Sequence, residues 1–203
     1  MLFKPPGFVK RMMPSLVWDM AGEKDVFLTF DDGPTPGVTE WILETLAKYD
    51  AKATFFCLGK NVEQHPQTYM KILDGGHRTG NHTYSHQKGW SMTTERYVED
   101  VDFAAQLIHS DLFRAPYGRI KPSQARVLSE RYHMIMWDVL SRDYSSVITP
   151  RQCVRNVTKY VKPGSIVVFH DSHKSSRNVR YALPRVLDFI YNEKGLKCSA
   201  IEL

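Results

Sequence analysis

The sequence predicts an α/β fold built on a parallel sheet, and two observations support this. Short apolar runs alternate with longer segments of helical period along the 203 residues. The run at residues 166–169 is continuously apolar, which is typical of a strand in a buried sheet. Strands that alternate with helices in one chain favour parallel pairing through helical crossovers, so the sheet is either closed into a barrel or doubly wound.

The expected elements follow in a regular order. About seven strands are expected, at residues 26–30, 53–58, 77–80, 112–114, 133–137, 166–169 and 196–201. Helices are expected at residues 38–49, 65–73, 93–108, 122–130, 149–160 and 179–191. Thr149 before Pro150 is a typical helix start, Thr93 or Thr94 is expected to cap another helix, and Gly75 with Gly76 suits a left-handed helix end.

The chain is expected to form one domain over residues 26–203, preceded by an N-terminal arm at 1–25 that packs on it. Three prolines interrupt the arm, which lacks the apolar core and cleavage site of a secretory leader. No window approaches 18 consecutive apolar residues, so no transmembrane segment is expected. The default expectation is therefore a cytoplasmic protein, and association with the cell envelope stays open.

Composition limits the partners and the kind of metal site. The chain holds 27 Lys and Arg against 22 Asp and Glu, a net charge of +5 that is spread along the sequence, so no nucleic-acid partner is expected and no protein partner is implied. The three cysteines, Cys57, Cys153 and Cys198, are far apart, which favours free buried thiols. A thiolate metal site is excluded, so any zinc must be held by histidine and aspartate.

Polar residues follow the predicted strands at the end where parallel α/β sheets carry function. They are Asp31, Asp32, His82, His86, Arg114, Asp138, Asp143 and His170. All of them are ionisable, which is more than packing alone would require.

His82 and His86 are four residues apart, so one helical turn would place both imidazoles on one face. With Asp32 they would make a three-ligand site with one position open, which is typical of catalytic zinc. The alternatives are two surface histidines and, for Asp31 and Asp32, a turn in which a carboxylate caps the backbone next to Gly33.

His170 ends the most apolar strand, where Asp143 or Asp171 could keep its ring cationic, as a general acid requires. The alternative is a core histidine satisfied by the backbone. Arg114 is either a surface arginine or the partner of a carboxylate base. The turn around Tyr117 could point a backbone N–H at an oxyanion, so metal-assisted hydrolysis is the natural reaction class.

Five segments resemble, in order, the motifs of a known family. TFDDG at 29–33, HTYSH at 82–86, RAPYG at 114–118, WDVLSRDY at 137–144 and VFHD at 168–171 are similar to those of the NodB-type polysaccharide deacetylases, carbohydrate esterase family 4. The resemblance implies a distorted (β/α) barrel in a single domain, which removes the acetyl group from an N-acetylated sugar or glycan.

The resemblance also implies a role for each matching residue. The implied metal ligands, for zinc most simply and cobalt or another transition metal otherwise, are Asp32, His82 and His86. The implied catalytic groups are Asp31 as base, Arg114 as its orienting partner, His170 as acid and Asp143 as the residue that tunes it. The implied pocket residues are Tyr117, whose N–H would contribute to the oxyanion hole, and Trp137 and Tyr144 as walls.

Leu140 and Tyr144 depart from the family pattern, which often has Asp and Trp there, and this affects the shape of the pocket. The same site would also suit a deformylase or amidohydrolase acting on a lipid-linked sugar or a small amide. A non-catalytic carbohydrate-binding protein is a third reading, but binding alone needs none of Asp31, Arg114 and His170.

Overall fold

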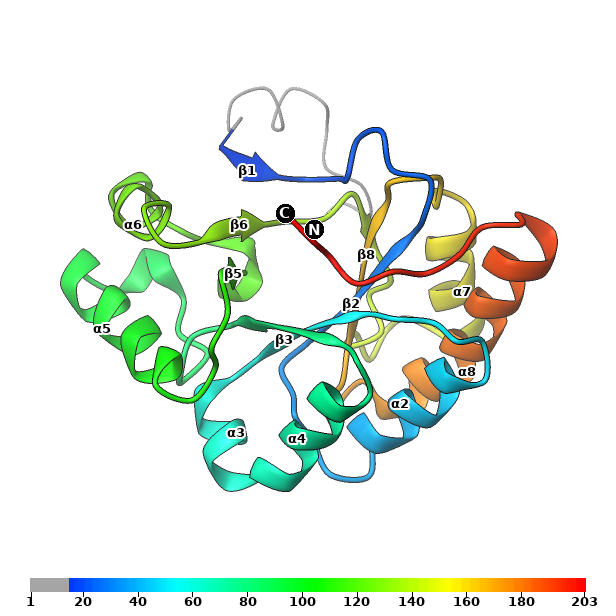
Figure 1. The fold of residues 1–203 in the computed structure, drawn as a ribbon, viewed down its shortest axis with the longest axis horizontal. Coiled ribbons are helices and arrows are strands. Elements are labelled where there is room, and N and C mark those ends of the chain that lie inside the picture. The colour runs from blue at the N-terminus through cyan, green and yellow to red at the C-terminus, as the bar shows by residue number, and fades with distance from the viewer. Residues whose placement is uncertain (1–14) are drawn as a thin grey trace.

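The computed structural model describes residues 15–203, and within them one parallel sheet of eight strands curls into a half-barrel (Figure 1). In spatial order the strands are β1 (Leu16–Val17), β6 (His133–Ile135), β5 (Leu112–Phe113), β4 (Arg78–Asn81), β3 (Thr54–Cys57), β2 (Phe27–Asp31), β8 (Ile166–His170) and β7 (Val139–Leu140). All the strand pairs are parallel. The predicted α/β fold class and single-domain barrel are therefore confirmed.

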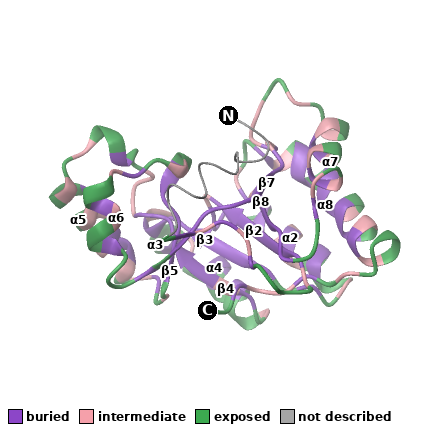
Figure 2. Ribbon diagram, turned by 90° about the horizontal axis from the view of Figure 1, so that it is seen from above, coloured by how far each residue is buried: buried purple, intermediate pink, exposed green. Residues whose placement is uncertain are grey.

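Helices surround the sheet and expose their outer faces (Figure 2). They are α2 (Thr39–Ala47), α3 (Gly59–Gln64), α4 (Pro66–Asp74), α5 (Thr94–Ala105), α6 (Pro122–Leu128), α7 (Pro150–Thr158) and α8 (Ser176–Asp188), followed by a π turn at Phe189–Glu193. Two predicted caps are confirmed: Thr149 accepts the amide of Gln152 at 3.2 Å, and Thr93 accepts that of Arg96 at 3.4 Å.

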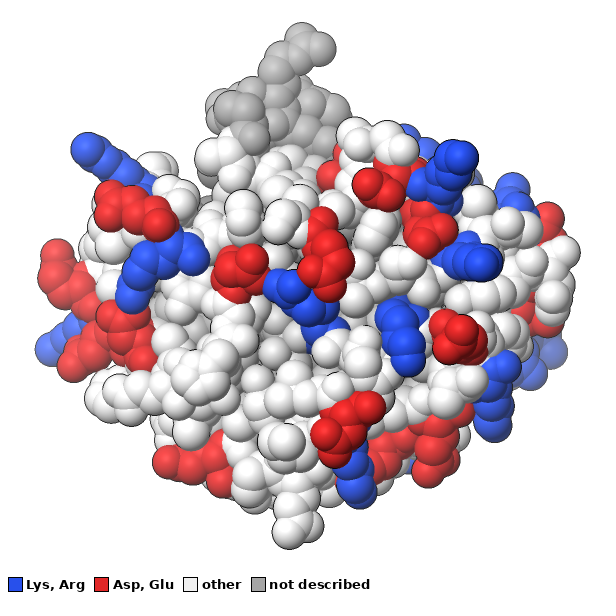
Figure 3. All heavy atoms as spheres, viewed as in Figure 1, with Lys and Arg blue, Asp and Glu red and all other residues white. Residues whose placement is uncertain are grey.

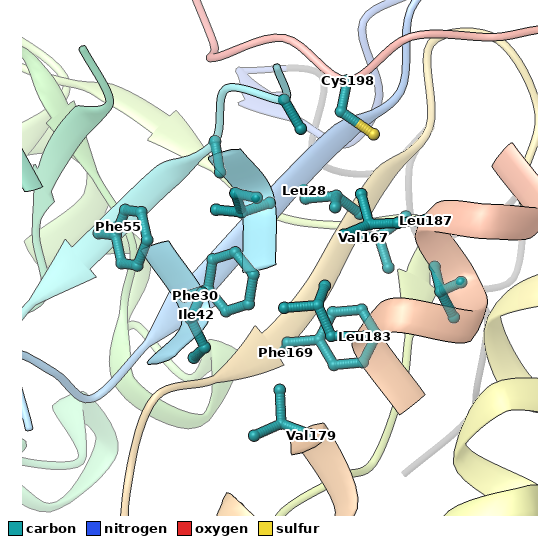
Figure 4. Close-up of a cluster of buried hydrophobic side chains, with 14 of the residues drawn as sticks. Leu28, Phe30, Ile42, Phe55, Val167, Phe169, Val179, Leu183, Leu187 and Cys198 are labelled. Carbon is teal, nitrogen blue, oxygen red and sulfur yellow. The ribbon is translucent and has the colours of Figure 1, made fainter. Parts of the chain in front are cut away.

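The central strands divide their side chains between two faces, which decides where chemistry can occur. On the outer face, Phe30 stacks on Phe55 and Phe169, with ring centres 5.0 and 6.0 Å apart, and Leu183 of α8 lies beside Phe169 (Figure 4). Successive strand residues point to opposite faces. Thr29 and Asp31, on either side of Phe30, therefore project into the half-barrel.

The predicted strand at residues 196–201 is wrong. The structure gives this segment a single bridge between Val26 and Cys198. Both edges of β2 are already paired, with β3 and β8, so the backbone bridge of the C-terminal segment forms at the residue before β2. The short strands β1 and β7, and helix α3, were not predicted.

The predicted arm lies, over residues 1–14, outside the described residues. Its remainder contains β1, which pairs with β6, and the buried side chains of Leu16, Trp18 and Met20. Among residues 15–203, no helix combines the length and the apolar character needed to cross a bilayer. Acidic and basic side chains are interspersed over the face shown in Figure 3. The three cysteines are buried and unpaired, as predicted.

Candidate active site

A pocket of about 380 Å³ opens at the carboxyl ends of the strands. Its lining contains every residue to which the family motifs assign a role except Arg114 and Asp143, which lie behind Asp31 and His170. The sequence also did not select four lining residues, Ala115, Gly118, Val168 and Lys174. Residues from five separate stretches of the chain therefore meet in one cavity.

His82 and His86 converge, but the helical turn expected between them is absent. The segment leaves β4 as a loop in which Thr83 and His86 have positive φ values of 68° and 59°. Asn81 Oδ1 accepts the amide of Thr83 at 2.8 Å, and Asp100 Oδ2 accepts those of Tyr84 and Ser85 at 3.0 and 3.1 Å. These bonds hold the loop in a shape that its own residues do not favour.

The tautomer of His82 follows from its partner. His82 Nδ1 lies 2.7 Å from the carbonyl oxygen of Arg114. A carbonyl can only accept, so Nδ1 donates and the lone pair of Nε2 points the other way. Burial lowers the pKa of His82 to about 4, so the imidazole is neutral at pH 7.

Asp32, His82 and His86 fit a divalent metal. Both Nε2 atoms approach Asp32 Oδ1, at 3.7 Å from His82 and 3.1 Å from His86, and the three candidate ligand atoms lie within 4.8 Å of one another. Ligand atoms around one tetrahedral zinc lie about 3.3 Å apart. Burial would raise the pKa of Asp32, but the hydrogen bond to His86 and the nearby histidine charges lower it below its ordinary value.

Asp31 is held by a fully buried arginine. Arg114 Nη1 donates to Asp31 Oδ1 at 2.7 Å and to Thr29 Oγ1 at 2.7 Å. The same guanidinium donates to the carbonyls of Ile135 and Met136 at 3.3 and 2.9 Å, with Phe56 packed 4.1 Å from its carbon. A buried ion pair needs this full set of partners, and the result is one fixed orientation for the carboxylate.

His170 is paired with Asp143, and Asp171 points elsewhere. His170 Nδ1 lies 2.8 Å from Asp143 Oδ1, and the backbone amide of His170 donates to Asp143 Oδ2 at 2.7 Å. Burial would lower the pKa of His170, but the Asp143 carboxylate and its hydrogen bond, followed by Asp32 and Asp31, raise it to about 9. Of the two partners left open by the sequence, the structure selects Asp143; Asp171 accepts from Thr39 instead.

Apolar and aromatic side chains form the rest of the pocket. Trp137 and Leu140 are buried at 6% and 2% exposure, and the Tyr144 ring packs edge-on to His170 with centres 4.8 Å apart. Tyr117 has a φ of 60° and its ring lies 4.7 Å from that of His86. A Cβ on Gly118 would come within 2.5 Å of Trp137, so glycine is needed at this close approach.

One strand-end residue stays outside the site. Asp138 accepts the amide of Ile166 at 2.9 Å and the hydroxyl of Ser165 at 3.1 Å, so it ties the segment before β7 to the start of β8. Sequence reasoning missed Asn81 and Asp100. The Asn81–Thr83 spacing typical of an Asx turn could have revealed the first, but nothing local marks Asp100.

Comparisons with known proteins agree with this geometry. The chain matches the family model described as polysaccharide deacetylase over residues 19–133. It is 31% identical over 192 residues to a peptidoglycan-N-acetylglucosamine deacetylase of Bacillus cereus, covering 91% of this chain and 87% of that protein. It is 31% identical over 164 residues to a chitooligosaccharide deacetylase of Bradyrhizobium sp., covering 76% and 74%.

A solved structure gives the same result for the fold. The family 4 carbohydrate esterase of Streptomyces lividans in complex with acetate matches with a TM-score of 0.78 at 27% identity, covering 88% of this chain and 93% of that one. Fold and pocket together define a hydrolase of non-peptide amide bonds. The chain belongs to the polysaccharide deacetylase family, carbohydrate esterase family 4, as its motifs indicated.

The cytoplasmic location expected from the sequence is wrong. Relatives of this chain are named for peptidoglycan, a cell-wall polymer that lies outside the cytoplasm. The expectation depended only on the absence of a leader-like pattern, which says nothing about the substrate. The chain also spans about a third of the length of some longer relatives.

Proposed function

We propose that the pocket hydrolyses the N-acetyl amide of a sugar unit within a glycan, releasing acetate and leaving a free amine. The observation that carries this proposal is the pairing of Asp31 with His170 in the register of β2 and β8. Register partners on adjacent parallel strands share a face, so a proton acceptor and a proton donor project into one cavity.

The metal set supports the same reaction. Asp32, His82 and His86 would hold a divalent metal, with zinc the simplest choice for two imidazoles and a carboxylate and cobalt an alternative. When bound, the metal supplies Lewis acidity toward the amide oxygen and the attacking water. The backbone N–H of Tyr117, in its left-handed turn, would donate to the same oxygen.

The two proton transfers are assigned to this chain's own side chains. Asp31, fixed through Oδ1 by Arg114, takes a proton from the water as its oxygen attacks the carbonyl carbon. His170, protonated at neutral pH because its pKa is about 9, gives a proton to the nitrogen as the C–N bond breaks. An amine leaves poorly unless it is protonated, so the second transfer is essential.

The apolar wall explains how an acetyl group would be recognised. Trp137 and Leu140 are buried in this wall, and the Leu140 side chain offers no hydrogen-bond donor or acceptor to the pocket. A methyl group gains about 0.8 kcal/mol from such burial. A formyl group has no methyl to bury, so we expect the acetyl substrate to be preferred over its formyl analogue.

The test is acetate release from the fully acetylated N-acetylglucosamine tetramer. Chelation should abolish release, and added zinc or cobalt should restore it. In Asp31→Asn, kcat should fall by roughly 100-fold or more, within the range of general-base catalysis, while bound metal measured by elemental analysis stays unchanged. Asp188→Asn makes the same chemical change at an exposed position on α8 and should have no effect.

Three outcomes would contradict the proposal. Activity that is indifferent to chelation would remove the metal mechanism. Near-normal turnover by Asp31→Asn would remove Asp31 as the base. A chain that binds the tetramer but releases no acetate under any metal condition would be a carbohydrate-binding protein instead.

A further inference from the structure

Beside the pocket lies a surface strip that the proposed chemistry does not use. It consists of Lys88, Trp90 and Arg119, and we call it the Trp90 strip. Trp90 is 61% exposed, which is unusual for the side chain with the largest apolar surface. The guanidinium carbon of Arg119 lies over its ring at 5.1 Å from the ring centre. An indole and two cations are therefore presented to solvent together.

The strip adjoins the pocket through Tyr117. The Tyr117 ring is 46% exposed, lines the pocket and lies 4.7 Å from the ring of His86. Lys88 Nζ sits over the same ring at 5.1 Å. Lys88 follows His86 by two residues and Arg119 follows Tyr117 by two. The neighbouring unit of a glycan whose acetamido group occupies the pocket is thus within reach of the strip.

The indole is held rigidly. Trp90 Nε1 donates to the carbonyl of Ile120 at 3.2 Å, and Gln124 Nε2 donates to the carbonyl of Gly89 at 2.9 Å. Lys121 Nζ donates to the carbonyl of Met92, at the other end of the Gly89–Ser91 turn, at 2.5 Å. A surface that is already ordered loses little conformational entropy when it binds, which is a property of built binding sites.

The cations of the strip are uncompensated. Over residues 15–203, neither Lys88 nor Arg119 forms an ion pair, whereas Lys71, Arg78 and Arg131 each pair with a carboxylate. Lys174 adds a further cation to the pocket lining. The carboxylates of that lining are Asp31, which pairs with Arg114, and Asp32, which belongs to the candidate metal site. The electrostatics of the pocket entrance and of the Trp90 strip therefore favour an anionic ligand.

We propose that the Trp90 strip binds an acidic sugar unit next to the unit that is deacetylated. The indole packs against the C–H face of the pyranose ring, and Lys88 and Arg119 bind its carboxylate. A neutral sugar could use the indole but would leave both cations without a partner. The proposal rests on the proposed function and narrows its substrate to a glycan that carries carboxylates.

Two tetrasaccharide probes of equal length test the strip. One is the neutral N-acetylglucosamine tetramer, and the other alternates N-acetylglucosamine with N-acetylmuramic acid, which carries a carboxylate. Lys88→Gln and Arg119→Gln should each raise KM for the acidic probe about two- to fivefold more than for the neutral one, the range of exposed ion pairs, and the double variant about tenfold more. Added salt should shrink the difference, because exposed charges are screened. Trp90→Ala should raise KM for both probes.

Matched variants elsewhere provide the controls. Lys159 Nζ lies 5.1 Å from the centre of the Tyr160 ring, the same arrangement as Lys88 on Tyr117. Neither Lys159 nor Tyr160 lines the pocket. Phe103 is an aromatic side chain of similar exposure, at 52%, on α5. Lys159→Gln and Phe103→Ala should leave the ratio of the two KM values unchanged.

The outcomes separate the strip from the proposed function. If the wild-type chain releases acetate from both probes and the double variant keeps the wild-type ratio of KM values, the proposed binding of an acidic sugar by the Trp90 strip is wrong and the proposed function stands. Acetate release from neither probe overturns the proposed function, and the strip with it. A selective loss on the acidic probe supports the strip.

Discussion

Replacing Asp143 by asparagine should lower the pKa of His170 and leave the rest of the pocket in place. The side chain is isosteric but loses its charge. In the structure Asp143 accepts from four groups, the ring and amide of His170, the amide of Tyr144 at 3.0 Å and the hydroxyl of Ser141 at 3.1 Å. Asparagine has a single side-chain oxygen, so it cannot offer one oxygen to the His170 ring and a second to the His170 backbone amide.

The size of the effect follows from the pKa. A rise from 6.5 to about 9 corresponds to about 3 kcal/mol in favour of the imidazolium in the folded state. Because the folded pKa is raised, this stability is fully present below the unfolded pKa near 6.5 and is lost as the pH rises through about 9. Most of it should disappear in Asp143→Asn, because Asp143 is the largest cause that raises the pKa.

Two measurements test this reasoning. Side-chain NMR titration of the metal-free chain should show the His170 pKa falling by about two units, while His77, with a pKa lowered to about 4 by burial, stays unchanged. Urea unfolding at several pH values should show that the wild type has a larger free energy of unfolding than Asp143→Asn, and that this difference shrinks between pH 7 and 9. A His170 pKa that stays near 9 in the variant would refute the assignment of Asp143 as its cause.

Three further predictions concern packing and metal binding. Gly33→Ala should lower the free energy of unfolding by about 2 kcal/mol or more, measured in urea, since the new Cβ would lie 1.8 Å from Asp171 Oδ2. Arg114→Lys should cost about 2 kcal/mol or more by the same measurement and lower kcat, because an ammonium cannot reproduce four guanidinium bonds. His82→Ala should weaken zinc binding by about 100-fold or more in competition with a chromophoric chelator, and unchanged affinity would exclude it as a ligand.

Strand-end chemistry was predictable because it follows from topology. Once parallel strands were inferred, Asp31, Arg114 and His170 had to meet at one edge of the sheet, and the structure places Asp31 and His170 in the pocket with Arg114 paired to Asp31. Helix starts at Thr93 and Thr149 were predictable because the cap depends on a local hydroxyl.

Features that depend on distant contacts were not predictable. Strand β7 has two residues, too few for any periodicity, and exists because β8 offers a free edge. The loop that presents His86 needs left-handed backbone, which is stabilised by Asp100 from α5. In the sequence, Asp100 is indistinguishable from a solvated helix residue.

The two adjacent carboxylates serve one pocket only because the backbone turns between them. Successive strand residues diverge, so Asp31 and Asp32 would face opposite sides if β2 continued. Asp32 instead has a φ of 82°, a left-handed conformation that costs about 1 kcal/mol or more. Asn61 Nδ2 donates to the Asp32 carbonyl at 2.7 Å, and the amide of Leu58 donates to the Gly33 carbonyl at 2.9 Å. The loops after β2 and β3 thus stabilise the turn that makes one carboxylate a candidate base and its neighbour a candidate ligand.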